Sequence, residues 1–211
     1  MPADRRGGKR SELMMAFLRS AALRIAPRGV SISAILYRAA AVLGFVGLIA
    51  LGAHLKIALP YTPVPVTFQT FFVLLAGAIL GPAEGVAAVT LYLAGGALGV
   101  PFFARPGISG LAYFTGITGG YLFGFIAASV IVGIGVRRTQ RLAAQALLFA
   151  AAALLILGCG TAWLYVIGGR ALWPAVMAGL VPFLAGDTLK AGAALFAYRA
   201  LRMAVPDKSD A

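Results

Sequence analysis

Charged residues are scarce in this sequence. Only 11% of its 211 residues are Asp, Glu, Lys or Arg, whereas 61% are hydrophobic and the mean hydropathy is +0.94. A soluble globular domain is excluded, because such domains carry about 25% charged residues. The apolar runs are continuous rather than alternating, which disfavours a membrane β-barrel. The sequence therefore predicts an all-α polytopic membrane protein, long enough for about six spans of ~20 residues.

Cysteine and histidine occur once each, as Cys159 and His54. One cysteine excludes an internal disulfide and a cysteine-based metal site, and one histidine excludes a histidine-rich metal centre. The chain also has no Walker-type phosphate loop, so we expect it to hydrolyse no nucleotide by itself. We expect no metal and no cofactor.

Acidic residues are few as well, at six against 18 basic ones, which gives a net charge of +12. Eight basic residues lie in the first 38 positions, and no cleavable apolar core of a secretory signal accompanies them. We expect a basic cytoplasmic extension over residues 1–33, a membrane domain over 34–203 and a polar tail over 204–211. The extension suits anionic lipid better than nucleic acid, so the expected partner is the lipid bilayer.

The apolar segments predict six transmembrane helices. We expect them over residues 39–57, 66–80, 85–100, 116–136, 142–167 and 172–200, the last being interrupted at Pro182 and Gly186 and resuming at Asp187. Six spans would place 14 basic residues on the side of both termini and three on the other. The positive-inside rule then predicts that both termini are cytoplasmic.

Three irregular segments converge on the outer side in this topology. They are the proline-rich stretch 60–67, the connection 101–112 with the following Thr-Gly-Gly-Tyr turn, and the region around Asp187. Irregular backbone at membrane depth needs protein or a water-filled cavity around it. The convergence predicts a ligand pocket that is open to the exterior.

Asp187 and Lys190 are the strongest candidates for a functional site. They are three residues apart, so they share one face of a helix, and no other charge lies between residues 171 and 198. Each charge alone would cost about 2.5–3.5 kcal/mol in a bilayer on insertion scales, so a pair facing a polar cavity is favoured. Alternatively, Asp187 caps a helix N-terminus and Lys190 extends to the membrane interface.

The other polar residues have side chains that are better suited to binding a ligand than to catalysing a reaction. Lys190 and Arg105 can bind a carboxylate, and Asp187 can accept N–H donors of a urea or an amide. The further candidates are Gln69, Thr67, Tyr121, Gly119 and Gly120. Each also has a structural explanation: Gln69 can satisfy a helix end, the glycines can pack helices, Tyr121 can belong to an interfacial belt, and Arg105 can be a solvated loop charge.

An intramembrane hydrolase is the alternative from another functional class. The segment 107–110, with Ser109, resembles the nucleophile turn of rhomboid-type proteases. Such a serine needs a histidine base on a later helix, whereas His54 precedes it. The hydrolase is therefore disfavoured.

Five motifs carry a family resemblance across residues 35–200. They are Pro-Val-Pro-Val-Thr-Phe-Gln-Thr at 63–70, Leu-Leu-Ala-Gly-Ala-Ile-Leu-Gly-Pro at 74–82, Gly-Val-Pro-Phe-Phe-Ala at 99–104, Thr-Gly-Gly-Tyr-Leu-Phe-Gly-Phe at 118–125 and Pro-Phe-Leu-Ala-Gly-Asp-Thr-Leu-Lys at 182–190. The chain resembles the BioY family, the biotin-specific S components of energy-coupling factor (ECF) transporters. Ile117 departs from the usual proline, and Arg105 from a small or amide residue.

The resemblance implies a six-helix S component in the bacterial inner or cell membrane, which takes up biotin from the exterior. It implies that Asp187 and Lys190 contact biotin. It also implies a transmembrane coupling (T) protein and two ABC-type ATPase subunits as partners, with Ala40 and Gly44 facing the coupling protein. An S component for another vitamin and a facilitator that works without ATPases are the alternatives.

Overall fold

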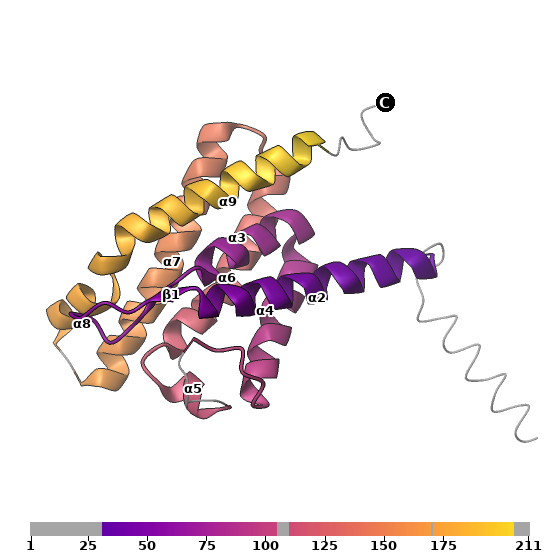
Figure 1. Cartoon of the computed structure of the whole chain (residues 1–211). Coiled ribbons are helices and arrows are strands. Elements are labelled where there is room, and N and C mark those ends of the chain that lie inside the picture. The colour runs from indigo at the N-terminus through magenta and orange to yellow at the C-terminus, as the bar shows by residue number, and fades with distance from the viewer. Residues whose placement is uncertain (1–30, 105–109, 170, 205–211) are drawn as a thin grey trace, which may run out of the picture. The chain divides into compact units, whose positions relative to one another are not determined.

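The computed structural model describes residues 31–104, 110–169 and 171–204, and these are mostly helical (Figure 1). The elements are α2 (Ile32–His54), β1 (Lys56–Ile57), β2 (Val66–Thr67), α3 (Gln69–Leu80), α4 (Pro82–Ala97), α5 (Ala112–Thr115), α6 (Gly119–Arg138), α7 (Leu142–Gly168), α8 (Leu172–Gly179), the 3-10 turn η1 (Val181–Phe183) and α9 (Leu184–Ala204). The described residues divide into two units, the first ending at Ala39 and the second beginning at Ala40. Residues 31–39 are all exposed.

Four helical stretches of the described residues are long and apolar enough to cross a membrane: Ile32–His54, Gly119–Arg138, Leu142–Gly168 and Leu172–Ala204. Each coincides with a predicted span, although α2 begins seven residues earlier than expected. The two remaining predicted spans correspond to α3 and α4, with 12 and 16 residues. These helices are shorter than the ~20 residues that a full crossing requires.

The proline-rich segment is not helical, as predicted. Lys56 pairs with Thr67 and Ile57 with Val66, in an antiparallel two-stranded sheet that closes the segment into a hairpin. The three prolines between the strands prevent regular helix, because proline has no N–H to donate. The hairpin delivers the chain to the start of α3.

Gly81 makes the tight turn between α3 and α4. Its φ of 87° lies in the region that favours glycine, and Pro82 occupies the first turn of α4, where its missing N–H costs nothing. The Arg137 side chain donates a hydrogen bond to the Leu80 carbonyl at 3.4 Å. The turn therefore lies at the same end of the second unit as the basic end of α6.

Small residues let α6 and α7 pack closely. A Cβ atom on Gly120 would lie 2.2 Å from the Cβ of Trp163 and 2.5 Å from the Cys159 carbonyl oxygen. A Cβ on Gly124 would lie 2.9 Å from the Cα of Ile156. Glycine on α6 therefore brings the two backbones together, as is common between membrane helices.

The break in the last apolar region lies around Pro182, as predicted, but not at Gly186. Residues 181–183 form the 3-10 turn η1, and α9 begins at Leu184, so Gly186 is inside the helix. The expected interruption at Gly186 is wrong, because a single glycine weakens a helix by only about 1 kcal/mol relative to alanine. Asp187 accordingly lies in the first turn of α9.

The C-terminal end of α9 is hydrogen-bonded to the start of α7 and to the connection that precedes it. Arg199 donates to the side chain of Gln145 at 2.9 Å, and Arg202 donates to that of Gln140 at 2.7 Å. Arg199 lies twelve residues after Asp187, which is about 18 Å along a helix. The arginines of α6 and α9 therefore gather at the end of the second unit that is remote from Asp187.

The packing of α6 against α7 predicts unequal effects of two glycine substitutions. Gly120→Ala should destabilise the protein by about 1–3 kcal/mol, because its methyl group overlaps Trp163 and a backbone carbonyl. Thermal unfolding of the purified chain in detergent measures this. Gly158→Ala, on α7, is the control: nothing lies within 4 Å of its added Cβ, so stability should stay or rise. Equal effects of both changes would contradict this packing.

Candidate functional site

A pocket lies at the end of the second unit that is remote from the arginines. The space around it that no protein atom fills, including solvent at its open mouth, is about 490 Å³. It is lined by Val64, Pro65, Thr67, Gln69, Thr70, Ala104, Tyr113, Thr118, Tyr121, Leu122, Phe125, Ile156, Leu157, Phe183, Asp187 and Lys190. The convergence predicted from three distant segments is therefore present.

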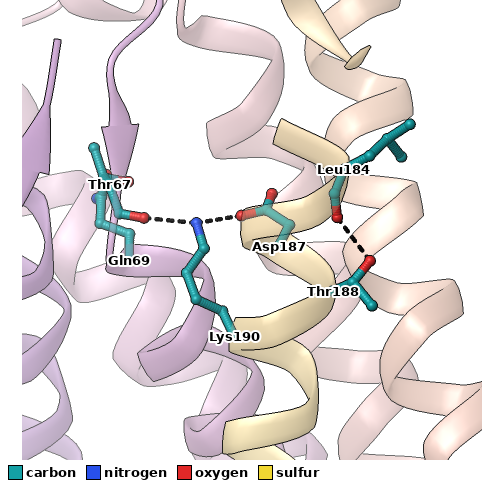
Figure 2. Close-up of polar contacts among 6 residues, drawn as sticks. All are labelled: Thr67, Gln69, Leu184, Asp187, Thr188 and Lys190. Carbon is teal, nitrogen blue, oxygen red and sulfur yellow. Dashed lines mark hydrogen bonds and ion pairs between the residues drawn. The ribbon is translucent and has the colours of Figure 1, made fainter. Parts of the chain in front are cut away.

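Asp187 and Lys190 form an ion pair in the wall of this pocket (Figure 2). Both residues are buried, at 4% and 8% exposure. The Lys190 ammonium also donates to the Thr67 carbonyl oxygen at 2.8 Å. Lys190 thus bridges α9 and β2, and the alternative in which it extends to the membrane interface is wrong. The ion pair also engages Asp187, in place of a capping role.

A chain of hydrogen bonds continues from Thr67 into α4. The Thr67 hydroxyl donates to the Gln69 side-chain oxygen at 3.2 Å, and the Gln69 amide nitrogen donates to the Tyr92 hydroxyl at 2.6 Å. Tyr92 is fully buried. Both ends of the Gln69 amide therefore have partners, which holds this side chain in one orientation at the pocket wall.

Tyr121 contributes the face of its ring to the pocket. Its hydroxyl donates to the Gly179 carbonyl at 2.6 Å, which connects α6 to the end of α8. The ring lies against Gly160, where an added Cβ would be 2.2 Å from ring atoms. Since the hydroxyl is already engaged by backbone, the ring acts as a fixed apolar wall.

A cluster of aromatic rings supports the segment that ends at Ala104. Phe103 stacks on Tyr113 with ring centroids 4.1 Å apart, and Tyr92 stacks on Phe102 at 5.9 Å. Both Ala104 and Tyr113 line the pocket. This cluster supports one side of the pocket through the packing of its rings.

The structure brings five of the predicted site residues together around the pocket: Asp187, Lys190, Gln69, Thr67 and Tyr121. Gly119 and Gly120 lie elsewhere, because they pack against Phe114 and Trp163. Arg105 lies outside the described residues.

Ala40 and Gly44, the two residues predicted to face a partner protein, are exposed on α2. A Cβ added to Gly44 would meet nothing within 4 Å. This part of α2 therefore has room for contact with another helix.

Sequence reasoning did not identify Tyr92 or the apolar wall formed by Phe125, Ile156 and Leu157. Tyr92 lies in a helix of small and aliphatic residues, where a tyrosine can equally belong to an interfacial belt. Apolar residues of α7 resemble one another in sequence, whether they face lipid or a ligand. Only their positions in the packed structure distinguish them.

The pocket suits a small molecule with a polar end and an apolar body. The ion pair has no net charge, yet it presents a carboxylate acceptor and an ammonium donor side by side. Asp187 Oδ1 makes the ion pair and accepts no hydrogen bond from the part of the chain that the structure describes. Among the described residues, no group of three or more His, Cys, Asp or Glu could hold a metal ion.

Comparisons with known proteins agree with this arrangement. The chain matches the BioY family over residues 20–207. A "Probable biotin transporter BioY" from Pyrococcus horikoshii is 36% identical over 152 residues, which cover 72% of this chain and 87% of the relative. A "Biotin transporter BioY" from Thermotoga maritima is 37% identical over 164 residues, covering 76% and 94%.

The fold is also similar to a solved structure. The crystal structure of the S-component for biotin from an ECF-type ABC transporter matches with a TM-score of 0.76 and 23% sequence identity, covering 83% of this chain and 95% of that one. The predicted S-component type of fold is thereby confirmed. With its four long apolar helices and its match across almost the whole sequence, the chain is a multi-pass membrane protein that belongs to the BioY family.

Proposed function

We propose that this chain is the substrate-binding S component of an ECF transporter, and that it binds biotin from the exterior for uptake. The observation that carries the proposal is the buried Asp187–Lys190 pair in the wall of a pocket, in a chain whose relatives are named biotin transporters. The family consists of transport components, and the chain is not an enzyme. Ser109, the candidate nucleophile of the hydrolase alternative, lies outside the described residues.

The chemistry of biotin matches the two kinds of pocket wall. Its ureido ring offers two N–H donors and a carbonyl acceptor, which suit Asp187 and Lys190 respectively. Hydrogen bonds to charged groups contribute about 1.5–3 kcal/mol each. Tyr121, Phe125 and Ile156 line the apolar space that would take the bicyclic ring and the aliphatic chain. Gln69 and Thr67 would keep the polar wall of the pocket in one arrangement through their hydrogen bonds. Gly119 and Gly120 would allow the close packing of α6 that positions Tyr121.

The proposed topology has six crossings, with the short helices α3 and α4 as the second and third. Arginines of α6 and α9 gather at one end of the second unit and the pocket lies at the other. The positive-inside rule then supports cytoplasmic termini and an outward pocket. The extension 1–33 and the tail 204–211 would flank the membrane domain, in a bacterial inner or cell membrane.

Energy for uptake would come from other subunits. The chain has no phosphate-binding loop of its own, so we propose a transmembrane coupling protein and two ABC-type ATPase subunits as partners. Ala40 and Gly44 are exposed small residues and would let a helix of the coupling protein approach closely. Another vitamin remains the alternative ligand, and binding competition between biotin and other vitamins distinguishes the two.

Removing one charge of the ion pair should abolish most of the biotin binding. Asp187→Asn leaves the buried Lys190 without a counter-charge and removes the acceptor for the ureido N–H groups. We expect binding of radiolabelled biotin to the purified chain to weaken by at least about tenfold, as for loss of one hydrogen bond to a charged group. Lys190→Met should have an effect of similar size.

Thr188→Ala provides the control for this experiment. Thr188 is exposed, and its hydroxyl donates to the Leu184 carbonyl on the side of α9 away from Lys190 (Figure 2). Biotin binding by this variant should equal that of the wild type. If Asp187→Asn and Lys190→Met both bind biotin normally, the proposed site is wrong.

Replacing Gly44 by a larger residue should lower biotin uptake and leave biotin binding unchanged. Gly44→Leu places a side chain on an exposed part of α2, a helix that contributes no residue to the pocket wall. Biotin binding to the purified chain should therefore be unchanged, while uptake by cells that express the ATPase subunits and the coupling protein should fall severalfold, because close helix contact is lost.

Cells that lack the coupling subunits supply the comparison for this variant. Uptake through the wild-type chain should be low in these cells, and Gly44→Leu should lower it no further. Wild-type uptake that is equally fast with and without the coupling subunits would favour a facilitator and contradict the proposed energy source.

A further inference from the structure

The Asp187–Lys190 pair in the pocket wall provides no net positive charge for an anionic group of a ligand. The described residues contain two acids, Glu84 and Asp187, and Asp187 is paired with Lys190. The pair is neutral as a whole. Among the described residues that line the pocket, a ligand carboxylate, such as that of biotin under the proposed function, would therefore find no net positive charge, and Asp187 would repel it.

Lys56 is the other described lysine at the pocket end. Its strand partner is Thr67, and the Cα atoms of directly paired residues lie about 4.5–5.5 Å apart with their side chains on one face of the sheet. Thr67 lines the pocket, and its carbonyl binds Lys190. The side chain of Lys56 therefore leaves the hairpin on the same face as that of a pocket-lining residue.

The ammonium of Lys56, an exposed residue, contacts the segment that contributes Ala104 to the pocket wall. It donates a hydrogen bond to the carbonyl oxygen of Ala104, a buried residue that lines the pocket. Nearby, His54 Nε2 contacts the Pro101 carbonyl at 2.9 Å. Residues at the end of α2 and on β1 thus hold the segment 101–104, and they bring a positive charge to the rim of the pocket.

We propose that Lys56 binds the carboxylate of the ligand at the rim of the pocket, and that it thereby selects for an acidic vitamin over a neutral analogue. An ammonium has three donors, and the bond to Ala104 uses one. In the described ranges Lys56 has no acidic partner, so its charge is available. This inference rests on the proposed function, with Asp187 and Lys190 on the ureido end of biotin and Lys56 on its acidic end.

The remaining described cations of the second unit do not compete for this role. Arg137 contacts the α3–α4 turn, and Arg199 and Arg202 contact the α6–α7 connection. Arg138 and Arg141 lie at the two ends of that connection, so all five are at the far end. Arg105 lies outside the described residues, and the experiment below therefore includes it as a separate variant. Lys56 is the described cation that is both close to the pocket and free of a counter-charge.

The test compares two ligands on purified full-length variants by equilibrium binding. Biotin carries the carboxylate, and biotinamide replaces it with a neutral carboxamide. Lys56→Gln should weaken biotin binding by about tenfold, the value of one charge-assisted hydrogen bond, and leave biotinamide binding unchanged. Lys56→Arg keeps the charge and should restore the preference for biotin. Arg138→Gln removes a charge from an exposed position of α6 and should change neither affinity.

Each other outcome has a distinct meaning. Equal weakening of both ligands by Lys56→Gln would show that Lys56 only holds Ala104, and would overturn the proposal. Unchanged biotin binding would overturn it as well, and loss of the preference in Arg105→Gln alone would assign the carboxylate to Arg105 instead. If the wild type binds neither ligand, the proposed function itself fails.

Discussion

The ion pair between Asp187 and Lys190 is the interaction on which the rest of the pocket end depends. Two charges with little solvent exposure are tolerated only when each has a partner, because the desolvation of an unpaired charge costs several kcal/mol. Lys190 finds a second partner in the Thr67 carbonyl, which exists as a free acceptor because β2 is a short edge strand. The polar site thus requires an irregular hairpin next to a regular helix.

Polar groups outside the regular helices find hydrogen-bond partners at both ends of the second unit, but in different ways. At the arginine end, helices are long, and side chains of Arg199 and Arg202 satisfy polar groups of the connection that follows α6. At the pocket end, α8 stops at Gly179 and α6 and α9 start at Gly119 and Leu184. Backbone carbonyls of Gly179 and Ala104 accept side-chain donors there. Regular helices leave few such acceptors, so a pocket forms where they end.

Much of the helical organisation could be predicted from the sequence. The spans expected at 116–136 and 142–167 correspond to α6 and α7 within three residues at each boundary. Continuous apolar runs that are bounded by arginine and glycine define where a membrane helix begins and ends. The pairing of Asp187 with Lys190 followed from their spacing on one helix face. The extent of α9 was predicted less well, because a glycine inside a helix is tolerated when packing supports it.

The sequence by itself determined that the chain is helical and apolar, that its basic residues are unevenly distributed, and that Asp187 and Lys190 lie on one face, since all three depend on local composition and spacing. Only the tertiary structure decided that Lys190 meets Thr67, 123 positions away, and that Gly120 packs against α7 instead of lining the pocket. Such contacts depend on how helices pack against one another, and apolar helix surfaces in a membrane look alike in sequence whether they face lipid, another helix or a ligand.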